Sequence, residues 1–235
     1  MRALVIGGSG SIGQAIVQRL LAEDYEVIVH YNSADYDRLV ELYENQPVQL
    51  VQADLTKDVD INAIFGFIQN LDCLIYTSGA SLYGMLQDMT DDDIDDSYML
   101  HVKQLLRLTR YFVDQLRQSA HGRIVVVSSI WGEAGASFET VYSTMKSAQL
   151  GFVKALSREL AMTTVTVNAI APGFVNGHMA REFDDQTLAE IVEELPQQRL
   201  VEPEEVAHTC AYLCHPLAQS VTGTVQKVNG GWYIS

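Results

Sequence analysis

Short, continuous apolar runs alternate along the chain with longer segments in which apolar residues recur at helical spacing. A short apolar run without polar alternation is typical of a strand that is buried on both faces. These runs predict seven strands, at Ala3–Ile6, Val27–Val29, Val48–Val51, Cys73–Tyr76, Ile124–Val127, Val165–Ile170 and Thr224–Val228. The segments between them predict helices at Ile12–Leu21, Tyr36–Tyr43, Asn62–Gln69, Val141–Leu160 and Glu204–Leu213, with two more between Asp91 and Arg117.

Strands that alternate with helices indicate a parallel sheet covered by helices on both faces. Because such crossovers are right-handed, we expect an α/β fold, a doubly wound Rossmann-type parallel sheet. No linker-like stretch divides the 235 residues, so we expect a single domain over residues 1–235. Ligands of a doubly wound sheet bind beyond the carboxyl ends of its strands, which is where functional residues are expected.

The chain carries a net charge of −15, from 15 basic and 30 acidic residues. A strongly negative surface repels phosphate backbones and anionic lipids, so nucleic-acid and membrane-surface functions are disfavoured. The densest acidic run, Asp91 to Asp93, is interpreted as the first turn of a helix, where acidic side chains are favourable. No export signal and no 18-residue apolar stretch is present, so we expect a cytoplasmic protein.

Three cysteines occur, too few and too irregularly spaced for a disulfide framework. Cys73 lies within an apolar run and is predicted to be a buried strand residue. Cys210 and Cys214 are one helical turn apart, with His208 and His215 nearby. Structural zinc sites combine paired ligands across a longer loop, so no metal site is expected here.

A glycine-rich turn joins the first predicted strand to the first predicted helix. The pattern Gly8-x-Gly10-x-x-Gly13 fits the dinucleotide-binding fingerprint, in which glycines let backbone N–H groups approach a pyrophosphate at the helix N-terminus. A tight strand-to-helix turn without a ligand has the same pattern. The turn alone therefore favours cofactor binding only weakly.

The residues that end the second strand, His30 to Ser33, bear on the choice of dinucleotide. An acidic residue at this place often binds the adenosine ribose of NAD. Here the first carboxylate is Asp35, and the nearest basic side chain is Arg38. His30, Asn32 and Ser33 offer neutral hydrogen-bond donors to a phosphate. We therefore expect NADP, with NAD as the alternative.

Three residues form the candidate for chemistry. Tyr142 and Lys146 are four apart near the start of a long predicted helix and so share one face. Ser129 follows the fifth predicted strand, thirteen residues before Tyr142. A lysine ammonium and an oxidised nicotinamide nearby lower the pKa of a phenol, and a serine hydroxyl polarises a carbonyl. The group is suited to hydride transfer to a ketone with Tyr142 as proton donor, although each residue alone also fits an ordinary helix face or cap.

Over essentially its whole length, the sequence resembles the short-chain dehydrogenase/reductase family. The resemblance rests on Gly7 to Gly13, Ser129, Tyr142-x-x-x-Lys146, Pro172-Gly173 and two C-terminal segments, residues 199–207 and 228–231. It implies an NAD(P)-dependent enzyme with Ser129, Tyr142, Lys146 and His101 as catalytic residues. It also implies that the cofactor is held by Gly7, Ser9, Ser11, Ile12, Gly13, Tyr31, Asn32, Ser33, Asp54, Leu55, Ser78, Gly79, Tyr142, Lys146, Pro172 and Val175.

The sequence departs from the family pattern at several positions. Ser11 replaces a usual glycine, and Tyr76 to Ser78 replace Asn-Asn-Ala. His101 stands where the family has an asparagine that helps to hold a water behind the lysine. A histidine can do the same and is expected to titrate near neutrality; simple packing is the alternative. Gly177 replaces a threonine that contacts the nicotinamide amide.

Two substrates follow from the resemblance. General similarity is greatest to reductases of 3-oxoacyl groups on acyl carrier protein, but Ala120 and Thr163 stand where docking arginines are expected. The stretch from Ser128 to Ser137 is more similar to reductases of the 5-aminopentanone group on elongation factor P. An acidic rim suits a substrate with a free amine. A catalytically weak, cofactor-sensing regulator or scaffold remains the alternative, and the family resemblance implies a homotetramer packed through the helix of Tyr142.

Overall fold

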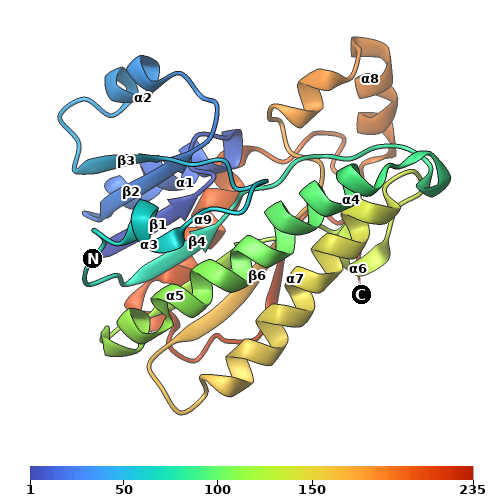
Figure 1. Ribbon diagram of the computed structural model, residues 1–235. Coiled ribbons are helices and arrows are strands. Elements are labelled where there is room, and N and C mark those ends of the chain that lie inside the picture. The colour runs from blue at the N-terminus through green and yellow to red at the C-terminus, as the bar shows by residue number, and fades with distance from the viewer. Residues whose placement is uncertain (235) are drawn as a thin grey trace.

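The computed structural model describes residues 1–234, apart from the side chain of Glu182. One parallel sheet of order β3-β2-β1-β4-β5-β6-β7 forms its centre (Figure 1). Its strands are β1 (Arg2–Ile6), β2 (Glu26–Tyr31), β3 (Val48–Gln52), β4 (Cys73–Tyr76), β5 (Arg123–Val127), β6 (Thr166–Pro172) and β7 (Val225–Val228). All seven predicted strands are present, and the doubly wound Rossmann-type order is confirmed.

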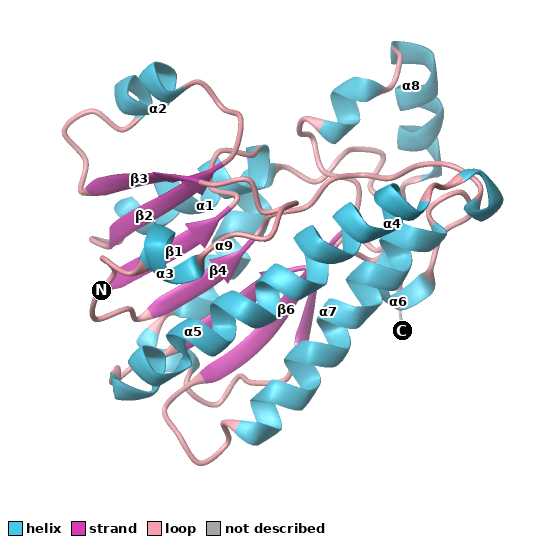
Figure 2. Cartoon of the chain, in the orientation of Figure 1, coloured by secondary structure: helices cyan, strands magenta, loops and turns pink. Residues whose placement is uncertain are grey.

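Helices cover both faces of the sheet (Figure 2). They are α1 (Ser11–Leu21), α2 (Tyr36–Leu42), α3 (Ile61–Phe65), α4 (Asp91–Tyr98), α5 (Gln104–Gln118), α6 (Trp131–Ala134), α7 (Thr140–Glu159), α8 (Asp185–Glu194) and α9 (Pro203–Cys214). Successive side chains of a strand point to opposite faces. In β1, Leu4 and Ile6 accordingly pack with α3, α5 and α7, whereas Ala3 and Val5 pack with α1 and α9.

The structure corrects the end of one predicted helix and adds helical elements that the sequence did not predict. The helix predicted to reach Gln69 ends at Phe65, because Gly66 closes it and Asn70 takes a left-handed conformation with φ 58°. The two helices predicted between Asp91 and Arg117 are joined without a loop by a π-helical turn, Met99–Lys103. The segment before Leu195 contains a 3₁₀ turn and α8, a helix that the sequence did not suggest; α6 was also missed.

Two predictions about individual residues are confirmed. Asp91 to Asp93 form the first turn of α4, where Thr90 and Asp93 make a reciprocal capping box. Cys73 is fully buried in β4, and Cys210 and Cys214 are likewise buried free thiols. Within residues 1–234, no three potential metal ligands lie close enough to hold an ion, and no helix there has the length and apolarity to cross a bilayer.

Candidate active site

The glycine-rich turn at the carboxyl end of β1 is closely packed. Gly7 has φ +80°, and a Cβ there would lie 2.7 Å from the Ser78 nitrogen. A Cβ on Gly13 would lie 2.2 Å from the Gly7 carbonyl oxygen, so glycine is required at both positions. Helix α1 begins at Ser11 behind Gly10, and no side chain caps it. Its first amides, including those of Ser11 and Ile12, therefore remain available to an anion.

A buried imidazole, that of His30, holds the glycine-rich turn in place by a hydrogen bond. His30 is 2% exposed; its Nδ1 accepts a hydrogen bond from the Gly7 N–H at 3.1 Å. Its Nε2 therefore carries the proton and donates to the Ala53 carbonyl at 3.0 Å. Burial lowers the pKa of His30 to about 4, so the ring is neutral. The expectation that His30 contacts a phosphate is wrong, because both ring nitrogens are already used inside the fold.

The residues expected to contact the adenosine half of a dinucleotide lie at the ends of β2 and β3. Asn32 and Ser33 are exposed, whereas Tyr31 is buried. Asp54 is exposed and its carboxylate accepts hydrogen bonds from the N–H and hydroxyl of Thr56. The next residue, Leu55, is buried.

The first carboxylate after β2 already has a hydrogen-bond partner within the fold. Asp35 accepts a hydrogen bond from the Arg38 N–H at 2.8 Å and thereby caps α2. Arg38 lies in the first turn of the same helix with an exposed side chain. The end of β2 itself thus presents neutral polar groups, Asn32 and Ser33, and no acidic side chain.

The segment after β4 lies directly against the glycine-rich turn. The Thr77 hydroxyl donates to the Ile6 carbonyl at 2.8 Å, and Ser78 packs on Gly7. The Tyr76 hydroxyl donates to the Leu100 carbonyl in the π-helical turn. The three residues that depart from the family pattern are therefore built into the fold, and Gly79 follows them beside Lys146.

Ser129, Tyr142 and Lys146 meet at the carboxyl end of β5. The hydroxyl of Ser129 hydrogen-bonds that of Tyr142. The Lys146 ammonium lies 5.6 Å from the centroid of the Tyr142 ring and donates to the Val127 carbonyl at 3.0 Å. The Ser128 hydroxyl donates to the Lys146 carbonyl at 3.0 Å, which holds α7 against this strand end. The predicted group is thus assembled in space.

Burial dominates the ionisation of this group. It raises the pKa of Tyr142 well above its usual value; the Glu139 carboxylate adds to the rise, and the hydrogen bond from Ser129 opposes it. Burial lowers the pKa of Lys146 to about 7. The phenol is therefore protonated at neutral pH, ready to donate a proton, while the lysine can lose or gain one. The lowering of this pKa by a lysine together with an oxidised nicotinamide concerns the site with its cofactor and stays a prediction.

His101 lies in the π-helical turn, next to both candidate groups. Its ring meets that of Tyr142 edge-on, with centroids 5.6 Å apart, and its Nε2 lies 3.2 Å from the Ala80 carbonyl oxygen. Its Nδ1 is buried without a hydrogen-bond partner. Burial and then the Lys146 charge lower its pKa to about 3. The expectation that His101 titrates near neutrality is therefore wrong.

A loop after β6 extends over the start of α1. Pro172 ends the strand. Val175 then forms a parallel bridge with Val201, whose backbone hydrogen bonds are made by the residues on either side of Val175. The N–H and carbonyl of Val175 itself therefore remain available to a ligand. The His178 N–H donates to the Ser11 hydroxyl at 3.0 Å. A Cβ on Gly177 would lie 3.0 Å from the same hydroxyl. The two departures at positions 11 and 177 therefore face each other.

Glu139 is one residue near this site that the sequence analysis missed. It immediately precedes α7, three residues before Tyr142, and its carboxylate Oε2 is buried without a hydrogen-bond partner. The available signal was its spacing, because residues three apart at a helix start lie on one face.

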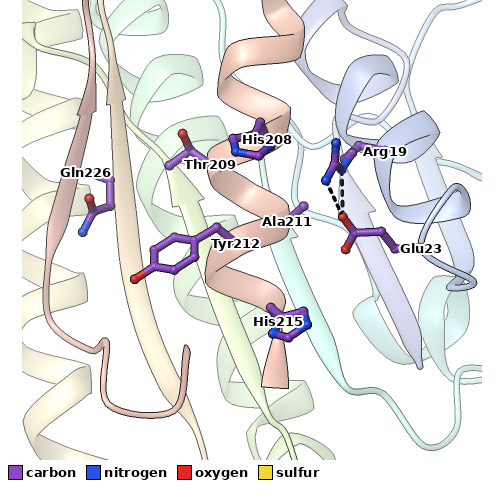
Figure 3. Close-up of a pocket in the computed structure, with 8 residues that line it drawn as sticks. All are labelled: Arg19, Glu23, His208, Thr209, Ala211, Tyr212, His215 and Gln226. Carbon is purple, nitrogen blue, oxygen red and sulfur yellow. Dashed lines mark hydrogen bonds and ion pairs between the residues drawn. The ribbon is translucent and has the colours of Figure 1, made fainter. Parts of the chain in front are cut away.

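A separate hollow of about 410 Å³ lies between α1 and α9, away from these residues (Figure 3). The Arg19–Glu23 ion pair borders it on one side, with a 2.8 Å contact. His208, Tyr212 and His215 border it on the other. None of the candidate site residues lines this hollow, which therefore has no part in the site at the strand ends.

Comparison with known proteins gives matches over nearly the full chain. A family model described as enoyl-(acyl carrier protein) reductase matches residues 7–233. The uncharacterized oxidoreductase YmfI of Bacillus subtilis (strain 168) is 37% identical over 238 residues, which cover 98% of each chain. The 3-oxoacyl-(acyl-carrier-protein) reductase FabG of Escherichia coli (strain K12) is 30% identical over 236 residues, 99% of this chain and 97% of its own.

A solved structure agrees with these sequence matches. A crystal structure of an actinorhodin polyketide ketoreductase variant with NADPH is similar with a TM-score of 0.91 and 29% sequence identity. The match covers 98% of this chain and 96% of that one. The likeness therefore extends over nearly the whole of both chains.

Proposed function

The chain belongs to the short-chain dehydrogenase/reductase family and is an oxidoreductase, and from that membership we propose that it reduces a ketone to a secondary alcohol with NADPH. One observation carries the proposal. Tyr142, hydrogen-bonded to Ser129 and close to Lys146, lies at the same edge of the sheet as the uncapped start of α1. A proton donor and an anion-binding helix end at one edge suit hydride transfer from a dinucleotide.

The residues present fit a dinucleotide. The glycine-rich turn leaves no room for side chains at Gly7 and Gly13, and the α1 amides of Ser11 to Gly13 are free to bind the pyrophosphate. We assign Asp54 and Leu55 to the adenine, and Ser78, Gly79, Pro172 and Val175 to the nicotinamide half, as the family resemblance implies. When bound, the nicotinamide supplies the hydride. Ser9, whose carbonyl accepts from the Gln14 amide, completes the turn.

NADP is favoured over NAD by the end of β2. Asn32 and Ser33 offer exposed, uncharged donors, and Asp35 is engaged as a helix cap. A carboxylate there would repel a 2′-phosphate and bind a ribose hydroxyl. The related ketoreductase structure contains NADPH.

A single substitution tests this preference for NADP. Asn32→Asp is expected to raise the KM for NADPH about tenfold or more and to lower that for NADH, as one charge repulsion of roughly 1.4 kcal/mol predicts. Steady-state kinetics with both dinucleotides measure the ratio, and Gln49→Glu, on the exposed part of β3 away from the strand end, is the control for added charge. An unchanged ratio in the Asn32 variant would place the discrimination elsewhere.

Each candidate residue has a task in the reduction. Ser129 donates a hydrogen bond to the substrate carbonyl oxygen and polarises it. As the hydride adds to the carbonyl carbon, the Tyr142 O–H proton passes to the oxygen, which leaves a phenolate. The Lys146 ammonium stabilises that phenolate and provides a route for its reprotonation. His101, neutral and with a free buried Nδ1, is suited to hold a water on this route.

Two carbonyl substrates are consistent with the chain. Identity of 30% to a 3-oxoacyl-(acyl-carrier-protein) reductase supports a carrier-bound 3-oxoacyl group. The similarity of residues 128–137 to the elongation factor P subgroup supports a 5-aminopentanone group on that protein. The net charge of −15 disfavours an acidic carrier protein and favours a substrate with an amine. We therefore propose the amino ketone, with elongation factor P as partner, ahead of acyl carrier protein.

We further propose that residues 1–235 act as one domain in a cytoplasmic homotetramer. The outward side of α7 supports a helix-to-helix interface, because Ala148, Gly151 and Ala155 are exposed while Phe152 and Leu156 are half-buried. Small residues on such a face allow a second helix to approach closely. Analytical ultracentrifugation of the purified chain measures the subunit number, and a monomer would contradict this arrangement.

The reductase proposal is tested with NADPH deuterated at the transferable position. The purified protein is incubated with small ketones, a 3-oxoacyl carrier protein and the aminopentanone form of elongation factor P. Mass spectrometry is expected to find deuterium on the carbinol carbon of an alcohol product. Tight NADPH binding without oxidation across this panel would instead support a cofactor-sensing regulator.

A further inference from the structure

Glu139 places a carboxylate near the Tyr142 phenol. It is the residue immediately before α7, and Tyr142 follows it by three positions on the same face of the helix start. Residues at this spacing have Cβ atoms about 5–6 Å apart. The charge of Glu139 acts directly on the Tyr142 phenol, adding to the effect of burial on its pKa. The Glu139 carboxylate and the Tyr142 phenol are therefore close enough to influence each other electrostatically.

The carboxylate has no partner within the described part of the chain. Its Oε2 is buried and accepts no hydrogen bond, and among residues 1–234 no cationic side chain forms an ion pair with it. Burial raises the pKa of Glu139 above its usual value. It makes no side-chain cap for α7 either. A half-buried acid without a cation or cap is unfavourable to the fold, and a cation brought by a ligand removes that cost.

The turn that carries Glu139 is held firmly. Phe138, the preceding residue, adopts a left-handed conformation with φ 63°, which is uncommon for a bulky side chain. Its ring stacks on Tyr83 with centroids 5.5 Å apart and planes inclined by 17°. Its carbonyl accepts a hydrogen bond from the Gly84 N–H at 2.7 Å. Both rings are exposed, so the turn that carries Glu139 also presents aromatic faces, which attract cations.

We propose that Glu139 is the specificity-determining residue for a cationic group of the substrate, which is therefore a ketone with a protonated amine a few bonds from its carbonyl. The inference rests on the proposed ketone reductase function, because it takes Tyr142 as the residue that fixes the carbonyl. The ammonium forms an ion pair with Glu139 while the carbonyl oxygen receives hydrogen bonds from Ser129 and Tyr142. The distance between the two recognition points selects the length of the substrate.

A pair of matched ketones tests the inference. 5-(Dimethylamino)pentan-2-one is cationic at neutral pH and, as a tertiary amine, does not cyclise onto its carbonyl. Its uncharged counterpart of the same shape is 6-methylheptan-2-one. We expect wild-type kcat/KM with NADPH to be about tenfold or more higher for the amino ketone, which is the value of one partly shielded charged contact. In Glu139→Gln this ratio is expected to fall to about one.

The ratio separates a contact with the amine from a general effect on Tyr142. Removing the Glu139 charge also changes the phenol, but that change affects both ketones alike. Glu159→Gln is the matched control, because this exposed carboxylate lies at the other end of α7; its ratio is expected to equal that of the wild type. Glu139→Asp keeps the charge on a shorter side chain and is expected to retain part of the preference.

The outcomes distinguish the two proposals. Reduction of both ketones at equal efficiency, or a preference that survives in Glu139→Gln, would overturn the role of Glu139 and leave the reductase function intact. Failure to reduce either ketone, or the protein-bound aminopentanone, would overturn the function and with it this inference. Circular dichroism and NADPH binding by Glu139→Gln verify that a lost preference does not come from a lost fold.

Discussion

Ser11 and Gly177 occupy one space between the first turn of α1 and the loop after β6. The Ser11 hydroxyl accepts the His178 N–H at 3.0 Å, and a Cβ on Gly177 would lie 3.0 Å from both the Cβ and the hydroxyl of Ser11. The backbone at Gly177 does not have a positive φ, so its lack of a side chain serves space alone. The hydrogen bond between the His178 N–H and the Ser11 hydroxyl thus holds the loop against the first turn of α1. The Ser11 side chain also leaves little room for a side chain at position 177.

Gly177→Ala is expected to displace this loop and raise the KM for NADPH about threefold to tenfold, as loss of one hydrogen bond predicts. Trypsin cleavage after the exposed Arg181 should become faster. Ser11→Gly removes the obstructing atoms, so the double variant should be less impaired than the sum of the two single changes. His178→Ala keeps the backbone donor and is the control. Strict additivity in the double variant would contradict the shared space.

His30 is expected to make the fold sensitive to acid. Its pKa is about 4 in the fold and 6.5 in the unfolded chain, so the unfolded chain binds the proton first as the pH falls. Its contribution is present above pH 6.5 and is lost on lowering the pH towards 4, to a total of about 3 kcal/mol. His30→Gln keeps both hydrogen bonds without a titrating ring, so its free energy of unfolding should fall less.

Urea unfolding at a series of pH values measures this difference. The exposed His208 provides the control, since His208→Gln should follow the wild type. Identical pH dependence in wild type and His30→Gln would show that His30 does not keep its neutral, buried state.

His101 is expected to act without changing its charge. Because its pKa is about 3, kcat between pH 5 and 8 should contain no step from this ring. His101→Asn, which retains a polar atom, should keep the shape of the pH profile, whereas His101→Leu should lose about tenfold in kcat because a water on the proton route is no longer held. A step near pH 6.5 that disappears in His101→Asn would contradict the neutral ring.

The order of strands was predictable because each strand is buried on both faces and leaves an uninterrupted apolar run. Helices were predictable where they pack on the core. Helix α8 has no buried residue, so the core imposes no periodicity on its sequence. The early end of α3 depends on Gly66, whose position inside an apolar segment gives no sign of whether it interrupts or closes a helix.

The sequence was sufficient to predict which residues form the candidate site, but it did not predict several of their contacts. Ser129, Tyr142 and Lys146 follow from spacing and strand ends. The His30 ring points into the fold, where its Nδ1 accepts a hydrogen bond from the Gly7 N–H. This contact joins two segments that are distant in the sequence, so no local pattern encodes it. His101 is neutral because segments far apart in the sequence bury it. Glu139 lacks a hydrogen-bond partner because of how the whole chain folds around it, which its neighbours in the sequence do not reveal.

The central claim is that the Tyr142 phenol donates the proton in ketone reduction. Tyr142→Phe removes one hydroxyl and keeps the ring that packs against His101. The most direct measurement is single-turnover NADPH oxidation by this variant with a ketone that the wild type reduces, together with NADPH binding by fluorescence. We predict unchanged binding and a rate about 10²–10⁴ lower, the range for a lost general acid. Turnover at the wild-type rate would contradict the account.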